Sequence, residues 1–179
     1  MDFSARVDDD IELVLADERA APVLHRLILE NLDHLRPWEE LARDGLTLAE
    51  MADDLRAGRR AWAEGRAIPT AIRYRGHVVG AAGARLAPEV ARAEIGYWID
   101  AAHQGRGIVT RAVGALVRTL FEDHGTHRVE LRTAADNHRS RAVAERLGFT
   151  LEGTLREAYP IAGRRHDLCV YGLLRGDRR

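Results

Sequence analysis

The sequence contains no lysine, so all 27 of its basic residues are arginine. A nucleotide-binding P-loop requires the lysine of its GxxxxGK[ST] motif, and a pyridoxal enzyme requires a lysine for its Schiff base. An arginine guanidinium stays protonated and replaces neither group. Both classes of protein are therefore excluded, and any bound phosphate must be met by backbone N–H groups and arginine side chains.

Cysteine is almost as scarce, because Cys169 is the only one in the sequence. A single cysteine excludes an internal disulfide. Cys169 lies in the apolar run 168–174, where we expect it to pack as a small hydrophobic side chain, since a reactive thiol needs a polar and partly exposed setting. His124 and His127 have neither an HExxH pattern nor a cysteine cluster beside them, so we expect no metal site.

Long apolar runs and excess charge are also lacking. No run approaches the roughly 18 apolar residues of a membrane span, and residues 1–10 lack the apolar core of a signal peptide. We therefore expect a cytoplasmic protein that does not contact a membrane. A formal net charge of -1 gives no basic field for direct nucleic-acid binding. The length of 179 residues, with 46% hydrophobic content, suits a single domain over residues 1–179.

The sequence does contain a clear succession of strand and helix patterns. Alternating apolar residues predict strands, and apolar residues at intervals of three and four predict helices. We expect strands at 11–15, 67–74, 77–86, 91–100, 128–133, 149–158 and 164–174, and helices at 19–35, 47–62, 108–121 and 137–147. This order favours a mixed α/β sheet with helices on its faces.

A glycine-rich turn joins the predicted strand 91–100 to the predicted helix 108–121. Glycine lets the backbone approach a ligand closely, and the free N–H groups at a helix N-terminus attract anions, so the turn predicts a phosphate site. The dinucleotide fingerprint GxGxxG is only partly met, because Gly105 and Gly107 are followed by Thr110 in place of the third glycine. Only one clear βαβ crossover accompanies it, which disfavours a nicotinamide or flavin site.

Three stretches follow one another in a recognisable order. Residues 93–99 read Ala-Glu-Ile-Gly-Tyr-Trp-Ile, residues 104–109 read Gln-Gly-Arg-Gly-Ile-Val, and residues 137–143 read Asn-His-Arg-Ser-Arg-Ala-Val, followed by Leu-Gly-Phe at 147–149. Together they resemble the GCN5-related N-acetyltransferase (GNAT) superfamily, whose acetyl-CoA motif is a Gln or Arg followed by xxGxG/A. The closing segment 151–174 is similar to the last hairpin of the RimJ/RimL branch, which acetylates the N-termini of ribosomal proteins.

The resemblance implies the GNAT fold, which is α/β (α+β by some schemes), with a splayed mixed sheet of about seven strands flanked by about four helices. It implies acetyl-CoA as the co-substrate, with the pantetheine arm between two central strands, and no metal. The implied activity is N-acetylation of a primary amine by direct transfer in a ternary complex. The expected acceptor is the N-terminal α-amine of a ribosomal protein.

The resemblance also implies which residues bind acetyl-CoA. The N–H groups of the turn are expected to bind the pyrophosphate, and the end of the preceding strand to pair with the pantetheine amides. The expected residues are Trp98, Ile99, Asp100, Gln104, Gly105, Arg106, Gly107, Ile108, Val109, Thr110, Asn137, Ser140 and Arg141. Asn137 equally suits a plain helix N-cap. Arg106, Arg139 and Arg141 could touch phosphates, although arginine is commonly a surface residue.

Direct transfer needs a base for the amine and help for the departing thiolate. Ser140 is implied near the acetyl-CoA sulfur, where its hydroxyl could stabilise or protonate the thiolate. Glu94 is the expected base, because a carboxylate inside a strand of a covered sheet is costly unless it is paired or used; its alternative role is an ion pair with an arginine. Tyr159 is a second candidate for proton transfer, and Trp38 and Trp62 are expected in the acceptor groove or in the core.

Other functions stay open at this point. The acceptor could be a small amine, an aminoacyl nucleotide, a polyamine or an antibiotic, whose ring Trp38 and Trp62 could stack. A module that binds acyl-CoA without catalysis is a rival from a different class. The acceptor, the acyl-chain preference and the oligomeric state, including a homodimer, do not follow from the sequence.

Overall fold

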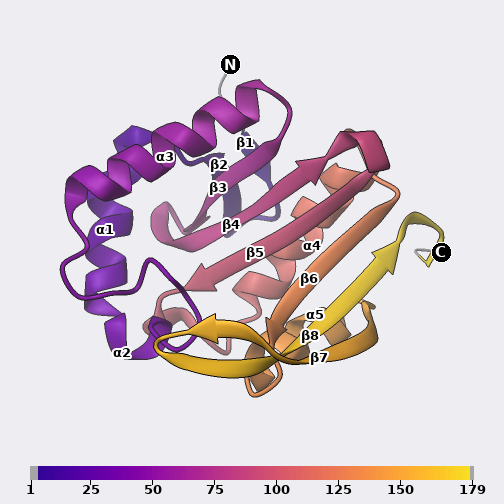
Figure 1. The fold of residues 1–179 in the computed structure, drawn as a ribbon. Coiled ribbons are helices and arrows are strands. Elements are labelled where there is room, and N and C mark those ends of the chain that lie inside the picture. Colours follow the sequence, from indigo (N-terminus) through magenta and orange to yellow (C-terminus); the bar gives the residue numbers. More distant parts are fainter. Residues whose placement is uncertain (1–3, 178–179) are drawn as a thin grey trace.

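The computed structural model describes residues 4–177 and contains a sheet in the order β1-β2-β3-β4-β5-β6-β8-β7 (Figure 1). Its strands are β1 Ser4–Arg6, β2 Ile11–Leu15, β3 Ala67–Tyr74, β4 His77–Ala87, β5 Arg92–Ile99, β6 Arg128–Ala134, β7 Thr150–Ile161 and β8 Arg164–Leu174. Neighbouring strands are antiparallel except for β5 and β6, which run parallel. The expected mixed sheet is confirmed.

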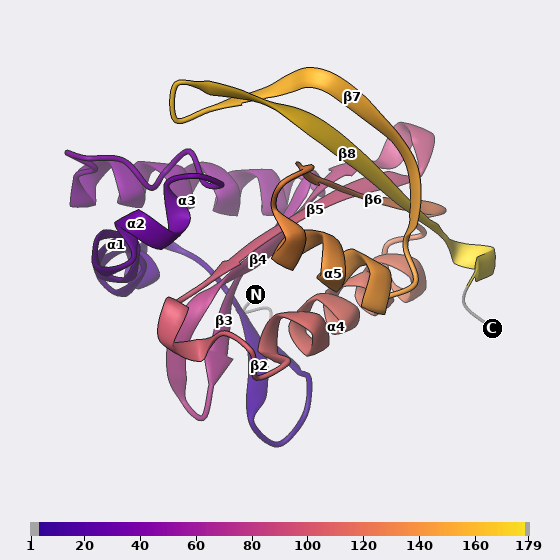
Figure 2. The ribbon, with the colours of Figure 1, turned by 90° about the horizontal axis from the view of Figure 1, so that it is seen from below.

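Five α-helices accompany the sheet within the described residues. They are α1 Ala21–Glu30, α2 Leu32–Leu35, α3 Leu48–Ala63, α4 Ile108–Glu122 and α5 His138–Arg146. Figure 2 shows α1, α2 and α3 on one side of the sheet and α4 and α5 on the other. No helix within residues 4–177 combines the length and apolar character needed to cross a membrane.

Each face of the sheet carries its own hydrophobic core, because alternate residues of a strand point to opposite faces. The larger core includes Ile95 and Ile99 of β5 together with Leu116 and Leu120 of α4, all buried. On the opposite face, Trp98 packs against the core formed by α1, α3 and the segment between them. Consecutive residues of β5 therefore hold helices on both faces and fix the strand in position.

The structure differs from the sequence-based expectation at the N-terminal helix and in the number of strands. A single helix over 19–35 is wrong, because the chain leaves helical geometry at Asn31 (φ -118°, ψ 19°) and α1 and α2 are separate. The Asn31 side chain donates to the Leu27 carbonyl and accepts from the Ala101 N–H, and such local bonds compete with helix continuation. The short strand β1, Ser4–Arg6, was not predicted from its polar sequence.

The central strands β5 and β6 separate partway along their length. Their parallel pairing joins Arg92 with Arg128 and ends at Ile95 with Leu131, although β5 continues to Ile99 and β6 to Ala134. Figure 1 shows the two strands diverging beyond the paired part. The splayed sheet that the resemblance implies is thus present, and it opens beside the glycine-rich turn.

Candidate active site

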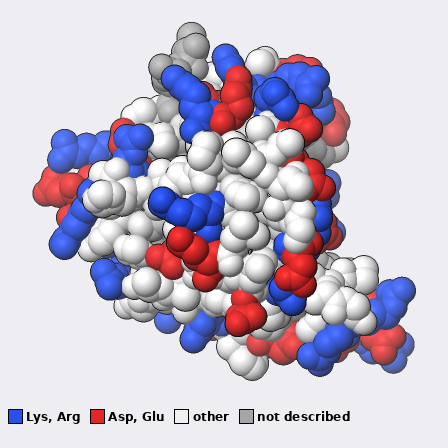
Figure 3. Space-filling view, turned by 90° about the vertical axis from the view of Figure 1, so that its left-hand side faces the viewer, with Lys and Arg blue, Asp and Glu red and all other residues white. Residues whose placement is uncertain are grey.

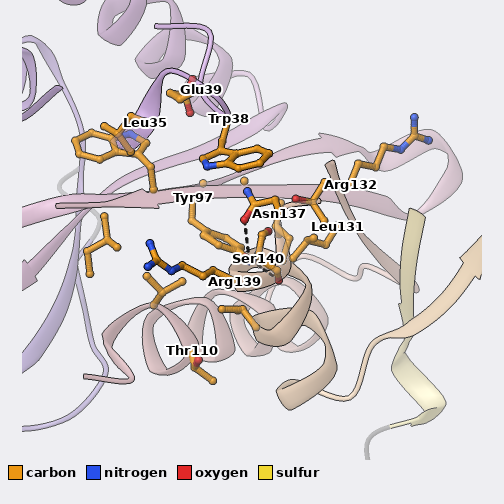
Figure 4. A pocket seen from close by; sticks show the side chains of 18 of the residues that line it. Leu35, Trp38, Glu39, Tyr97, Thr110, Leu131, Arg132, Asn137, Arg139 and Ser140 are labelled. Atoms are coloured by element: carbon orange, nitrogen blue, oxygen red, sulfur yellow. Dashed lines mark hydrogen bonds between the residues drawn. The ribbon is translucent and has the colours of Figure 1, made fainter. Parts of the chain in front are cut away.

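A cleft of about 1480 Å³ occupies the space between the diverging strands. It is lined by the ends of β5 and β6, the turn before α4, the start of α5, the segment after α2, and Tyr159 of β7. Figure 4 shows that side chains from the N-terminal helical region and from α5 approach each other across it. Most of the residues expected at the site are therefore brought together in one cavity.

The turn before α4 has the geometry of an anion-binding cradle. Gly105 (φ +71°) and Gly107 (φ +69°) both adopt the left-handed conformation that favours glycine. The backbone N–H groups of residues 105–110 have no hydrogen-bond partner within the described part of the chain, and they lie at the positive end of the α4 dipole. The N–H of Gln104 is already bonded to the Ala101 carbonyl at 3.3 Å.

The side chain of Gln104 connects the two walls of the cleft. Its amide nitrogen lies 2.7 Å from Nε2 of His34, and its oxygen accepts from Arg139 at 2.8 Å. Burial, followed by the charge of Arg139, lowers the pKa of His34 below its ordinary value, so the neutral imidazole accepts the amide proton. Gln104 therefore ties α2 to α5 through the turn.

The end of β5 contributes some, but not all, of the residues expected there. Trp98 and Ile99 line the cleft. Asp100 does not belong to the lining; it accepts from the Ala102 N–H and from His103, and so caps the short 3₁₀ turn Ala101–His103. Its own N–H is bonded to the Val79 carbonyl of β4.

Ser140 lies in the first turn of α5 and faces the cleft (Figure 4). Asn137 caps this helix by accepting from the Ser140 N–H at 3.1 Å, as the cap interpretation of Asn137 required, and it also lines the cleft. The Tyr97 phenolic oxygen lies 2.9 Å from Ser140 Oγ and 3.2 Å from the Ser140 carbonyl oxygen. Burial raises the pKa of Tyr97 to about 12, so its phenol stays protonated.

The arginines of α5 divide into two groups. Arg139 and Arg146 line the cleft, as does Arg106 of the turn. Arg141 does not; it donates to the Tyr171 hydroxyl at 3.1 Å and to the Ala135 carbonyl at 3.0 Å. Its contacts hold α5 against the sheet.

Glu94 lines the cleft but already has partners. Its carboxylate accepts from Arg85 at 2.7 Å and lies 3.8 Å from Arg132. The Arg85 side chain is 81% exposed, and an exposed ion pair of this kind contributes little stability. The arginine pair that was the alternative for Glu94 is thus present, while the carboxylate is still accessible from the cavity.

The expected acceptor residues are only partly assembled. Trp38 lines the cleft, and the Tyr159 hydroxyl donates to the Trp38 carbonyl at 3.3 Å. Burial raises the pKa of Tyr159, and the charges of Glu39 and Glu40 raise it further. Trp62, in the last turn of α3, is not part of the cleft lining.

The cleft also contains residues that did not follow from the sequence, among them Tyr97, His34 and Glu39. Along β5, Tyr97 points to the face opposite to that of Glu94, Gly96 and Trp98, as strand alternation predicts. Its contact with Ser140, however, depends on the separation of β5 from β6. His34 and Glu39 lie in a region without a recognisable motif. Only the position of α2 over the end of β5 brings them to the cavity.

Acidic and basic side chains are interleaved over the face in Figure 3, both at its edge and near its centre, with uncharged areas between them. The described residues drawn there form no continuous basic patch. Within residues 4–177, no group of three or more His, Cys, Asp or Glu side chains is arranged to hold a metal ion.

Comparison with known proteins defines the class. A family model described as "Acetyltransferase (GNAT) domain" matches residues 11–150, and the chain belongs to this family of N-acetyltransferases. It is 33% identical over 175 residues, which are 97% of this chain and 96% of the relative, to "Putative ribosomal N-acetyltransferase YdaF" of Bacillus subtilis (strain 168).

Solved structures agree with this assignment. RimL, a ribosomal L7/L12 alpha-N-protein acetyltransferase in complex with coenzyme A, superimposes with a TM-score of 0.93 at 28% identity, covering 96% of this chain and 98% of RimL. MccE, a microcin C7 self-immunity acetyltransferase in complex with acetyl-CoA and AMP, superimposes with a TM-score of 0.88 at 28% identity, covering 94% of each chain. The implied GNAT fold is confirmed.

Proposed function

We propose that this enzyme transfers the acetyl group of acetyl-CoA to the N-terminal α-amine of a ribosomal protein, by direct transfer in a ternary complex. The observation that carries the proposal is the cleft between β5 and β6, with the cradle of free N–H groups at one end. The relatives named for ribosomal N-acetylation cover nearly the whole chain, which supports this acceptor class.

The residues present fit acetyl-CoA. The free N–H groups of residues 105–110 and the nearby Arg106 suit a pyrophosphate. The unpaired edges of β5 and β6 beyond Ile95 and Leu131 offer backbone groups to the amides of a pantetheine arm. Bound there, acetyl-CoA supplies an activated thioester, so the protein needs no nucleophile of its own.

Ser140 is the proposed group for the departing thiolate. It lies at the start of α5 with its hydroxyl directed to the cleft, and the N-terminal end of a helix favours negative charge. A free thiol has a pKa of about 8.5, so a hydroxyl donor and a favourable dipole suffice to stabilise the thiolate without a strong acid.

Glu94 is the proposed base for the amine. A protein α-amine has a pKa of about 7.7 to 8.0, against about 10.4 for lysine, so an N-terminal acceptor needs only a modest base or a water relay. The Tyr159 phenol lines the same cleft as Glu94 and donates to the Trp38 carbonyl, and it is proposed to assist proton transfer.

The position of Trp62 bears on the acceptor. Stacking of a ring between Trp38 and Trp62 requires both in the cavity, and of these two only Trp38 lines it. Trp98 also lines the cleft but packs against the core formed with α1 and α3, so an open cleft that holds Trp38 without Trp62 suits an extended polypeptide N-terminus better. An aminoacyl nucleotide is kept as a second candidate because the neighbour MccE is in complex with AMP.

The acceptor is tested by following free thiol release from acetyl-CoA. Peptides beginning with Ser, Ala or Met are compared with a panel of small amines and aminoacyl nucleotides. We expect turnover with at least one of the peptides. Turnover with small amines alone would contradict the protein acceptor, and absence of CoA binding would contradict the whole proposal.

The substitution Glu94→Gln tests the base. Without a base, only the amine that is already deprotonated reacts, and this fraction grows with pH. We expect the rate to fall most at low pH and the affinity for CoA to stay nearly unchanged. An unchanged pH–rate profile would remove Glu94 from the mechanism.

The wider setting is proposed on the same basis. We place the activity in the cytoplasm, where a ribosomal protein N-terminus is accessible, and assign it to one domain over residues 1–179. Residues 1–3 and 178–179 lie outside the part that the structure describes.

A further inference from the structure

Glu39 forms part of the cleft wall opposite the phosphate cradle. It is partly buried on the segment after α2, next to Trp38 (Figure 4). Its carboxylate accepts hydrogen bonds from backbone N–H groups, those of Leu41 at 3.5 Å and of Glu40. No arginine or histidine within the described residues forms an ion pair with it. Glu39 is therefore a partly desolvated carboxylate without a cation.

The surroundings of Glu39 differ from those of Glu94. Glu94, the carboxylate on the neighbouring wall, is neutralised by Arg85 and Arg132. Removing a carboxylate from water without a partner is costly, and burial accordingly raises the pKa of Glu39 above its ordinary value. A cation that enters the cleft beside Glu39 would offset this cost.

The cleft is also divided by charge. Arg106 and Arg139 lie at the phosphate cradle, whereas the wall at Trp38 carries Glu39, Glu40 and the Tyr159 phenol. Arg85 and Arg132, which also line the cleft, are paired with Glu94. The Tyr159 hydroxyl donates to the Trp38 carbonyl at 3.3 Å, which places it beside the residue that precedes Glu39. An anionic donor and a cationic acceptor are thereby directed to opposite ends.

An acceptor amine has the charge that this end requires. At neutral pH most α-amines, with a pKa of about 7.7 to 8.0, are protonated. An ammonium group is also what an N-terminal peptide and a small amine have in common. The chemistry at this end therefore recognises the amine itself rather than the rest of the acceptor.

We propose that Glu39 is the binding site for the acceptor ammonium group, with the Tyr159 hydroxyl beside it, and that it holds the amine before the proton is removed. This inference rests on the proposed function and adds to it the residue that binds the acceptor. Glu39 determines acceptor affinity, while Glu94 and Ser140 act on the reacting atoms.

The test uses the full-length enzyme and Glu39→Gln, which keeps the shape of the side chain and removes its charge. We expect KM for a Ser-initiated peptide to rise about tenfold or more, the effect of losing a hydrogen bond to a charged group, with kcat changed less than about threefold. The dissociation constant of the peptide, measured by calorimetry with CoA bound, should rise by the same factor. Glu39→Asp keeps the charge on a shorter side chain, so its KM and dissociation constant for the peptide should lie between those of the wild type and of Glu39→Gln.

Two matched controls separate charge recognition from shape. Glu89→Gln makes the same charge change at an exposed residue outside the cleft and should have no effect. The N-acetylated form of the peptide has no ammonium, so Glu39→Gln should leave its dissociation constant unchanged. Equal losses for both peptides, or equal behaviour of Glu39→Gln and Glu89→Gln, would overturn the proposal.

Failure of the proposed function gives a different result. If small amines are acetylated and peptides are not, the acceptor class is wrong. The same comparison is then made with the reactive amine and its N-acetyl product. If Glu39→Gln weakens binding of the amine but not of its N-acetyl product, the ammonium site would still be supported.

Discussion

The Tyr97 phenol contacts both the side chain and the backbone of Ser140. Its oxygen lies within hydrogen-bond distance of both the hydroxyl and the carbonyl of Ser140. Because the pKa of Tyr97 is raised to about 12 by burial, the phenol carries its proton at neutral pH. We therefore propose that Tyr97 positions Ser140, which remains the group proposed to meet the thiolate.

Tyr97→Phe is expected to lower kcat by about tenfold, the most that loss of one neutral hydrogen bond explains, since Ser140 Oγ loses its fixed rotamer. The affinity for CoA, measured by calorimetry, should change less than about twofold, because the ring still fills its place. Tyr74→Phe is the control, as the Tyr74 hydroxyl has no hydrogen-bond partner among the described residues. A loss of CoA affinity that matches the loss of kcat would contradict a positioning role.

At the scale of elements, the wall of the cleft depends on how closely β4 approaches β5. Gly80 pairs with Ile99. A Cβ atom at Gly80 would lie 2.3 Å from the Trp98 carbonyl oxygen and 2.9 Å from the Ile99 Cα. Both contacts are with backbone atoms, which cannot swing away as a side chain would. Only glycine therefore allows this spacing of the strands.

Gly80→Ala should displace the end of β5 and destabilise the protein by about 1 to 3 kcal/mol, the usual cost of overpacking. CoA affinity should fall as well, because Trp98 and Ile99 line the cleft. Urea unfolding and CoA calorimetry measure the two effects. Gly153→Ala, where a Cβ meets nothing within 4 Å, should have little effect on either. Unchanged CoA binding in Gly80→Ala would show that the position of this strand end does not govern the donor site.

The sequence predicted elements well where local signals were strong. The capping box of Thr47 and Glu50 marks the start of α3, and Asn137 marks that of α5. The motif at 104–110 located the cradle, because its glycines need positive φ angles. The break at Asn31 was not predicted, since it depends on a hydrogen bond to Ala101, 70 residues away.

The site was predicted as far as sequence motifs reach. Arg141 and Trp62 follow the expected helices but lie outside the cleft lining, because helix orientation decides which face meets the cavity. Glu39 and Tyr97 enter the site through contacts between distant elements. The roles of Glu94, Ser140 and Tyr159 stay predictions.

At the scale of the whole molecule, a cluster around Glu130 joins the two halves of the sheet. Glu130 of β6 is 5% exposed. It bonds Arg128 at 2.9 Å and Arg132 at 3.0 Å and lies 3.7 Å from Arg92 of β5. Arg128 also bonds Glu152 of β7. Burial alone would raise the pKa of Glu130, but the hydrogen bonds from Arg128 and Arg132 outweigh it and lower this pKa.

Glu130→Gln should destabilise the protein at pH 7 by about 2 kcal/mol, less than for a fully buried pair because the arginines are partly exposed. A lowered pKa in the folded state means that the charged form stabilises the protein above the ordinary pKa of 4.5 and that this contribution is lost as pH falls through the folded pKa. Urea unfolding should therefore show that the difference in free energy of unfolding between wild type and variant becomes smaller below about pH 4.5. A difference in free energy of unfolding that does not change with pH would contradict the lowering of the Glu130 pKa.

The early end of the pairing between β5 and β6 has a consequence for hydrogen exchange. Beyond Ile95 and Leu131, every second amide on the inner edge of each strand has no neighbour across the gap, so deuterium should replace these protons rapidly in the free enzyme. A bound pantetheine arm would slow this exchange, while the amides of residues 92–95 and 128–131, already paired, would stay slow throughout. The uptake rate of a few backbone protons thus reports whether the sheet has been completed by its own substrate.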